Sequence, residues 1–393
     1  MVSIERQVEK IIGRIKRFGD KALAEYLLKF DKIRLSPEEF KITNKEILEG
    51  VKKTAPNAFE AILVARNNIV DFYKKEKSLL KLDWKKLDKG KTLSQRLIPL
   101  ERVAVYVPGG KFPYPSTVLM SAIPAKVAGV KKIIMVTPPK KITPEILSAA
   151  FLSGVDEIYR VGGPAAIAAV AYGTKRIPKV DKIVGPGNKF VTEAKRKVFG
   201  DVGIDMLAGP SEVVIIADSK TNIDFVVNDL LAQLEHDVDA AAWVIYWQRS
   251  VENNIKKSVG KDYIKRIRFI KVRNPKEAAV KANIIAPEHL EIMCKNAHNL
   301  AKSITSAGAV FLGPFTPVAM GDYIAGPSHV LPTGGSARFS SGLSVTDFYK
   351  KINLIEYDKK SFKAESKFAS QIAIVEGMKY HAKSIKVRVN NET

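Results

Sequence analysis

Val103-Ala-Val-Tyr-Val-Pro-Gly-Gly110 is the stretch from which the fold can be read, because a short β-branched run ends there at two glycines. Strand-like segments recur at residues 132–137, 157–161 and 179–184, and helix-like segments separate them. Since parallel strands are joined through crossover helices, this alternation predicts a parallel α/β sheet. Such sheets bind ligands at the carboxyl ends of their strands, where three glycine-containing turns fall in this sequence.

The alternation continues with strand-like segments at 212–217, 241–247, 267–272 and 309–312. We therefore expect an α/β protein with two Rossmann-like domains, each with a parallel sheet, and small helical extensions at both ends. Residues 1–95 are predicted to be helical, and the tail to contain a helix at 360–376 and a strand at 384–389. The predicted boundaries are an N-terminal segment of residues 1–20, a first α/β domain of 21–102 and 212–343, a second of 103–211, and a tail domain of 344–393.

The glycine turns depart from the usual dinucleotide-binding motif. Both Gly109-Gly110 and Gly185-Pro-Gly187 lack the third glycine of the pattern Gly-x-Gly-x-x-Gly. A nucleotide site at these turns would therefore be a non-standard one.

The composition is that of an ordinary globular protein except for its charge. Of 393 residues 46% are hydrophobic, but 64 Lys and Arg against 41 Asp and Glu give a net charge of +23. Such a charge raises the hypothesis of nucleic-acid binding. The basic residues are spread along the whole chain, however, and we interpret the one cluster, at 74–91, as a solvated face or connector. We predict no nucleic-acid partner.

The sequence also bears on the compartment. No stretch reaches about 18 uninterrupted apolar residues, and the N-terminus lacks the apolar core of a secretory signal, so we predict no membrane partner. The single cysteine, Cys294, cannot form an internal disulfide, which favours a reducing compartment and predicts a cytoplasmic protein. Cys294 follows His289 by five residues on a predicted helix, and we interpret it as a structural thiol rather than a nucleophile for aldehyde oxidation.

The five histidines are the residues most informative about chemistry. Four of them lie near a carboxylate or an amide: His236 in Gln233-Leu-Glu-His236, His289 after Glu288, His329 shortly after Asp322, and His381 after Glu376. On these residues alone we expect a metal site of His, Asp and Gln ligands beside a general base. Nitrogen and oxygen ligands without thiolate suit zinc or manganese, and an imidazole that titrates near neutrality suits a base. Pro287 before the Glu288-His289 pair predicts a helix start there.

Eight longer motifs narrow the interpretation. In chain order they are Tyr106-Val-Pro-Gly-Gly-Lys-Phe-Pro-Tyr-Pro-Ser-Thr-Val-Leu-Met120, Val184-Gly-Pro-Gly-Asn-Lys-Phe-Val191, Leu207-Ala-Gly-Pro-Ser-Glu212, Gln233-Leu-Glu-His236, Ala286-Pro-Glu-His-Leu290, Gly321-Asp-Tyr323, His329-Val-Leu-Pro-Thr333 and Glu376-Gly-Met-Lys-Tyr-His381. Together they resemble the histidinol dehydrogenase family over residues 5–388.

The resemblance implies a reaction and a set of roles. The reaction is a four-electron oxidation of L-histidinol through L-histidinal to L-histidine, the last step of histidine biosynthesis, with two NAD reduced in turn. One zinc ion per site would orient the substrate, His289 would be the base for alcohol oxidation, and Glu288 would activate water on the aldehyde. The implied zinc ligands are Gln233, His236, Asp322 and His381; the implied substrate contacts are these four with Ser211, His289, His329 and Glu376; and the implied NAD contacts are Tyr106 and Asn188.

The resemblance also implies an assembly and leaves one question open. The family is a homodimer in which the tail of one chain completes the site of the other. The family's glutamine that touches the dinucleotide is replaced here by Ala165, so NAD is expected to be held there by backbone or by another residue. A zinc hydrolase with the same ligands is the second rival hypothesis, and a requirement for NAD separates the two.

Overall fold

The computed structural model describes residues 3–81, 83–110, 112–235 and 237–390, and of Asn390 its backbone alone. The chain forms two compact units. Unit 1 consists of Met1–Ser78 with Leu100–Phe348, and unit 2 of Leu79–Pro99 with Tyr349–Thr393.

The first sheet of unit 1 is parallel throughout and has the order β5-β4-β3-β6-β7. Its strands are β3 (Arg102–Tyr106), β4 (Lys132–Val136), β5 (Glu157–Tyr159), β6 (Lys182–Val184) and β7 (Gly203–Ile204). The crossover helices are α4 (Pro115–Ala128), α5 (Pro144–Ser153), α6 (Gly163–Tyr172) and α7 (Lys189–Val198). The chain reverses its direction of winding between β3 and β6, so the turns that follow these two strands are neighbours.

The second sheet repeats this arrangement with the order β10-β9-β8-β11-β12, again parallel throughout. Its strands are β8 (Glu212–Ala217), β9 (Ala241–Tyr246), β10 (Ile267–Lys271), β11 (His289–Ile292) and β12 (Ala309–Leu312). Its helices are α8 (Ile223–Glu235), α9 (Arg249–Ser258), α10 (Lys261–Ile264), α11 (Pro275–Ile285) and α12 (Ala297–Ala301). The predicted fold class, with two Rossmann-like parallel sheets, is confirmed.

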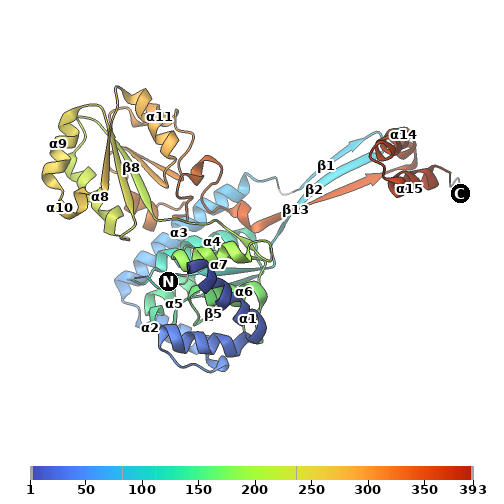
Figure 1. Cartoon of the computed structure of the whole chain (residues 1–393), viewed down its shortest axis with the longest axis horizontal. Helices are drawn as coiled ribbons and strands as arrows, with labels where there is room; N and C mark the ends of the chain where they lie inside the picture. The colour runs from blue at the N-terminus through green and yellow to red at the C-terminus, as the bar shows by residue number, and fades with distance from the viewer. Residues whose placement is uncertain (1–2, 82, 111, 236, 391–393) are drawn as a thin grey trace. The chain divides into compact units, whose positions relative to one another are not determined.

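The central strand β8 explains why this sheet carries helices on both faces. All six of its residues are buried, and alternate side chains enter different cores. Val213 and Ile215 pack with α8 and α9, whereas Val214 and Ile216 pack with α11 and α12. Figure 1 shows α8 and α9 on one side of β8 and α11 on the other.

The N-terminal helices cover the first sheet's own helices. They are α1 (Ile4–Tyr26), α2 (Asn44–Lys53) and α3 (Pro56–Ser78). Helix α1 packs on α6 and α7, α2 on α5, and α3 on α4 and α5. The predicted domain boundaries remain a proposal. In the described part of the chain, no helix is both long and apolar enough to cross a membrane.

Unit 2 differs from the prediction for these residues. Residues 83–95, expected to be helical, belong to the strands β1 (Asp83–Asp88) and β2 (Lys91–Pro99). Strand β2 is central and pairs antiparallel with β1 on one side and with β13 (Tyr349–Tyr357) on the other. The hairpin turn at Lys89-Gly90 has φ angles of 48° and 84°, which a helix does not allow. Two helices follow, α14 (Lys359–Val375) and α15 (Lys379–Asn390).

Two further local predictions are wrong. The alternating residues Ile385, Val387 and Val389 predicted a strand, but they belong to α15, because that helix packs along α14. His289 begins the strand β11 rather than a helix, since it pairs in register with Val213 of β8. The helical spacing between His289 and Cys294 therefore does not exist. Cys294 is nevertheless buried, and burial raises the pKa of its thiol to about 11, so a structural role fits.

Candidate active site

Glu288 and His289 lie side by side where β11 begins, and the backbone of one residue holds both of them. The amide N–H of Glu212 donates to Glu288 Oε2 at 3.0 Å, and His289 Nδ1 donates to the Glu212 carbonyl at 3.2 Å. Both side chains are buried, with 6% and 3% of each residue exposed. The backbone of Glu212, at the start of the neighbouring strand β8, thus fixes the orientation of the predicted acid–base pair.

The contact with Glu212 also determines the tautomer of His289. A carbonyl oxygen only accepts hydrogen bonds, so Nδ1 carries the proton and the lone pair of the neutral ring is on Nε2. Nε2 lies 3.9 Å from Asp322 Oδ1, and Nδ1 lies 3.6 Å from Glu288 Oε2. The two carboxylates would stabilise the imidazolium that forms if Nε2 accepts a proton.

Glu288 sits among other acids. Burial raises the pKa of its carboxyl well above the ordinary value, the Glu212 N–H opposes that shift, and the charges of Asp322 and Glu212 add to it. The Ser211 side chain is hydrogen-bonded to the same carboxyl. The predicted substrate contact Ser211 and the predicted catalytic residue Glu288 are therefore brought together.

Glu212 itself is a residue that the sequence reasoning missed. Its buried carboxylate accepts from the N–H of Gly334 at 2.6 Å and from that of Gly335. Gly209 N–H donates to Thr333 Oγ1 at 2.5 Å, so the loops before β8 and around Thr333 are joined twice. The available signal was its place at the end of the motif Leu207–Glu212, next to Ser211.

Asp322 and His329 are joined directly. Asp322 is in the short helix α13 (Val318–Tyr323), and its carbonyl accepts from His329 Nδ1 at 2.9 Å. His329 Nε2 lies 3.4 Å from the hydroxyl of Thr117, which α4 supplies. A helix of the first sheet and a loop that follows the second sheet therefore meet at His329.

The surroundings of Gln233 are the strongest structural support for a metal site. It is on α8, which packs against α13, the helix that carries Asp322. The residue is 3% exposed, and within the described residues neither its Oε1 nor its Nε2 has a hydrogen-bond partner. Since a buried unpartnered amide costs about 1–3 kcal/mol, this side chain fits a role as a ligand.

Three further predicted site residues, the metal ligands His236 and His381 and the substrate contact Glu376, are not among the described residues of unit 1. His236 lies outside the described residues. His381 in α15 and Glu376 at the end of α14 belong to unit 2 and are exposed there. Over the described ranges, no group of three or more His, Cys, Asp or Glu is placed to hold a metal. The amide of Gln233 is a ligand of another type.

The predicted NAD contacts lie on the neighbouring turns of the first sheet. Tyr106 ends β3, is 3% exposed, and accepts at its hydroxyl from Gly163 N–H at 3.1 Å. Asn188 caps α7, with Oδ1 accepting from two backbone N–H groups at 3.0 and 3.2 Å, so its Nδ2 is the group left for a ligand. Ala165 is fully buried in α6.

A buried ion pair holds the turn between β6 and Asn188. Lys195 donates from Nζ to the Gly185 carbonyl at 3.0 Å and forms an ion pair with Asp205. Asp205 Oδ2 accepts in turn from Gly185 N–H at 2.7 Å. Both polar groups of one glycine are therefore fixed by side chains that are themselves buried.

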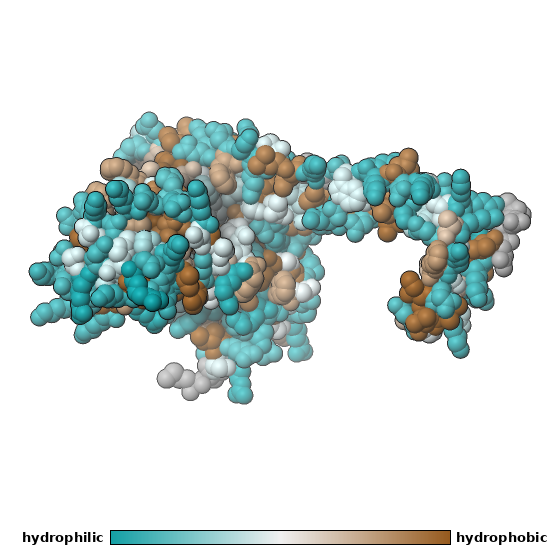
Figure 2. Space-filling model, turned by 90° about the horizontal axis from the view of Figure 1, so that it is seen from above, coloured by the Kyte–Doolittle hydropathy of each residue, from teal (hydrophilic) through white to brown (hydrophobic). Residues whose placement is uncertain are grey.

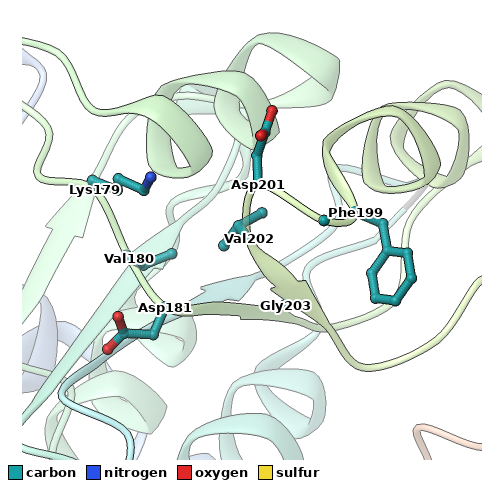
Figure 3. A pocket seen from close by; sticks show the side chains of 8 residues that line it. Lys179, Val180, Asp181, Phe199, Asp201, Val202 and Gly203 are labelled. Atoms are coloured by element: carbon teal, nitrogen blue, oxygen red, sulfur yellow. The ribbon is translucent and has the colours of Figure 1, made fainter. Parts of the chain in front are cut away.

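A hollow of about 420 Å³ lies at the other end of the first sheet. Figure 3 shows its lining, which consists of Lys179–Asp181 before β6 and Phe199–Gly203 at the start of β7. The Asp181 carboxylate accepts from the backbone of Glu101 and Arg102 at 3.0 and 2.9 Å. None of the predicted site residues is among those that line this hollow, so we do not take it as the candidate active site.

Two doubly wound parallel sheets, with a buried Glu–His pair where one strand begins, define this protein as an α/β enzyme. The model of the family described as histidinol dehydrogenase matches residues 1–389. The chain belongs to the histidinol dehydrogenase family and is an oxidoreductase, as its motifs predicted.

Individual relatives agree with the family model. The histidinol dehydrogenase of Bacillus cereus is 44% identical, over 99% of this chain and 94% of that protein. That of Aquifex aeolicus is 43% identical, over 98% of this chain and 93% of that protein. A crystal structure of histidinol dehydrogenase from Elizabethkingia anophelis superposes with a TM-score of 0.90 at 35% identity, covering 99% of this chain and 93% of that one.

Proposed function

We propose that this chain catalyses the NAD-dependent oxidation of L-histidinol to L-histidine through L-histidinal, the last step of histidine biosynthesis. The observation that carries the proposal is the Glu288–His289 pair, buried and oriented by the backbone of Glu212. Two distinct proton acceptors at one place suit a reaction with two chemically different oxidation steps.

His289 acts in the first step. Its Nε2 takes the hydroxyl proton as hydride leaves the carbinol carbon, while Nδ1 keeps its hydrogen bond to the Glu212 carbonyl. The carboxylates of Asp322 and Glu288, 3.9 and 3.6 Å from the ring nitrogens, offset the charge gained by the ring. In the second step Glu288 accepts a proton from the water that adds to the aldehyde, and Ser211 orients its carboxyl.

The metal in this proposal is zinc, held by Gln233, His236, Asp322 and His381. Support comes from the buried, unpartnered amide of Gln233 in the described part of the chain and from the packing of its helix against that of Asp322. When bound, zinc would orient the substrate through its nitrogen atoms. Ser211, His329 and Glu376 complete the proposed substrate contacts, and Tyr106 and Asn188 those to NAD.

Glu376 and His381 are proposed to come from the tail of a second copy of this chain. In β1 every residue is exposed, and in β13 eight of nine are, so both faces of these strands face solvent in the isolated chain. Large apolar side chains are exposed on unit 2, among them Leu87, Ile355, Phe368, Ile372, Val375 and Tyr380. Figure 2 shows brown, hydrophobic surface on this unit. Exposed apolar surface of this kind is typical of a protein interface.

Mixing two inactive chains tests the shared site. A His236→Ala chain combined with a His381→Ala chain should regain activity, because every mixed dimer then contains one intact site and one site that lacks both histidines. Mixed dimers that are shown to form but remain inactive would contradict the exchange of tails.

The activity is tested by following NADH absorbance with histidinol and NAD, before and after chelation and zinc return. The Glu288→Gln variant should still carry out the first oxidation but form one NADH per histidinol instead of two, with histidinal accumulating. Absence of NADH from the zinc-loaded wild-type protein would refute the proposed function. Hydrolysis without any need for NAD would favour the zinc hydrolase.

A further inference from the structure

Beneath the catalytic pair lies a second pair of acidic side chains, which the mechanism above does not use. Asp229 is on α8, one turn before Gln233, and Glu291 is on β11, two residues after His289 and on the same face of the strand. Their carboxyl groups are hydrogen-bonded to each other, and Glu291 is 1% exposed.

Glu291 also reaches the third element of the site. Its Oε1 accepts from the N–H of Val318 at 2.8 Å, and Val318 begins α13, one turn before Asp322. The same helix lies tightly on the sheet, since a Cβ on Gly321 would come within 2.5 Å of the Phe311 ring of β12. Helix α13 is thus fixed to β11 by a hydrogen bond and to β12 by close packing.

The contact between the two carboxyl groups requires a proton. Glu291 Oε2 is buried and has no N–H or O–H donor among the described residues, and two ionised carboxylates would repel each other. The ionisable groups on the elements packed here are Asp224, Asp229 and Glu235 of α8, His289 and Glu291 of β11, Asp322 and Tyr323 of α13, and Glu212 of β8. These described elements and β12 contain no Lys or Arg. Helix α9, which also packs on α8, carries Arg249, Glu252, Lys256 and Lys257, but none of these charges acts on Asp229 or Glu291. One shared proton is therefore what makes the pair attractive.

We propose that Asp229 and Glu291 are positioning residues, a carboxylic acid and a carboxylate whose hydrogen bonds hold α8, β11 and α13 together and thereby place Gln233, His289 and Asp322. This inference rests on the proposed function for the roles of those three residues. It predicts that the site depends on hydrogen bonding at Glu291 and not on the volume of its side chain.

The pH dependence of stability provides an independent signature. Burial and the charge of Asp229 raise the pKa of Glu291 to about 8, against an ordinary value of 4.5, and burial raises that of Asp229 as well. Between these two values the folded chain keeps a proton that the unfolded chain has released. The contribution of the pair to stability therefore falls as pH rises through this window.

Two substitutions of similar size separate hydrogen bonding from packing. Glu291→Gln keeps an acceptor for Val318 N–H and a donor for Asp229, whereas Glu291→Met keeps neither. Zinc alone, titrated into metal-free protein against a chromophoric chelator, should bind Glu291→Gln within about threefold of wild type and Glu291→Met at least about tenfold more weakly. The kcat with histidinol should follow the same order.

The outcomes that would overturn the inference are distinct from those for the proposed function. If Glu291→Met binds zinc as tightly as wild type, the side chain of Glu291 contributes only packing and not hydrogen bonding. If Glu291→Gln and Glu291→Met lose zinc affinity equally, the shared proton is refuted. If Glu291→Met does not fold, thermal unfolding decides: the midpoint of wild type should fall between about pH 5 and 9 relative to that of Glu291→Gln. Parallel curves would refute the shared proton. Absence of NADH from wild type would refute the function while leaving these comparisons valid.

Discussion

The two sheets of unit 1 have the same strand order, yet the residues that line them differ in kind. The first sheet ends in glycine turns, fixed at Gly185 by Lys195 and Asp205 and at Gly163 by Tyr106. The second gathers ionisable side chains, with Glu212, Glu288, His289 and Asp322 in mutual contact. Under the proposed function, the same fold would serve two tasks: cofactor binding at the glycine turns of one sheet, and proton transfer at the other.

The largest effect expected from this comparison is at the second sheet. His289→Asn removes the base but keeps a side chain that can donate to the Glu212 carbonyl, so kcat for histidinol oxidation should fall by about 100- to 10,000-fold. The KM for NAD should stay near the wild-type value, because the first sheet is untouched. Stopped-flow NADH absorbance measures both, and a raised KM for NAD with unchanged kcat would contradict this division of tasks.

A smaller and opposite effect is expected at the first sheet. Gly185 has a φ of 111°, and a Cβ there would lie 2.2 Å from the Tyr106 carbonyl, so Gly185→Ala should displace the turn. We expect the KM for NAD to rise about tenfold while zinc affinity is unchanged, since the strain of such a backbone costs about 1–3 kcal/mol and the clash adds to it.

Gly200→Ala is the matched control for this turn. Its φ is 106°, almost the same, but nothing lies within 4 Å of the added Cβ. It should lose stability in thermal unfolding without a change in the KM for NAD. An equal rise of that KM in both variants would show that strain in the sheet, and not the turn, controls the cofactor.

The smallest effect is expected at Cys294. Because burial holds its thiol protonated, with a pKa of about 11, Cys294→Ser should keep kcat within about twofold and lower stability by about 1 kcal/mol. Steady-state kinetics and urea unfolding check both values. Complete inactivation of a well-folded variant would instead support Cys294 as the nucleophile for aldehyde oxidation.

The sequence predicted the sheets well because buried parallel strands can be recognised locally, as short apolar runs separated by helical segments. In the first sheet, glycine turns after β3, β5 and β6 also mark the strand ends. It failed for residues 83–88, where the strand is charged and exposed on both faces and so lacks any apolar alternation. At His289 the preceding Pro287 and Glu288 indicate the start of a helix, but the segment forms the strand β11 because it pairs with β8.

The sequence predicted those residues of the candidate site that belong to recognisable motifs. The adjacency of Glu288 and His289 is visible in the sequence, but the residue that orients them, Glu212, is 76 positions away from Glu288. Asp229 and Glu291 appear as ordinary acids in the sequence until the fold brings their carboxyl groups together. Such roles depend on tertiary neighbours, which no local pattern encodes.

The exposure of both faces of β1 and β13 in unit 2 affects how this protein folds. A three-stranded antiparallel sheet with both faces of β1 and β13 in water gains little from burying apolar surface, so by itself it is marginally stable. If a second copy of the chain covers this sheet, association supplies the free energy that the isolated sheet lacks. The folding of unit 2 then depends on the square of the chain concentration. The melting temperature of this unit should then rise with protein concentration, as mass action requires.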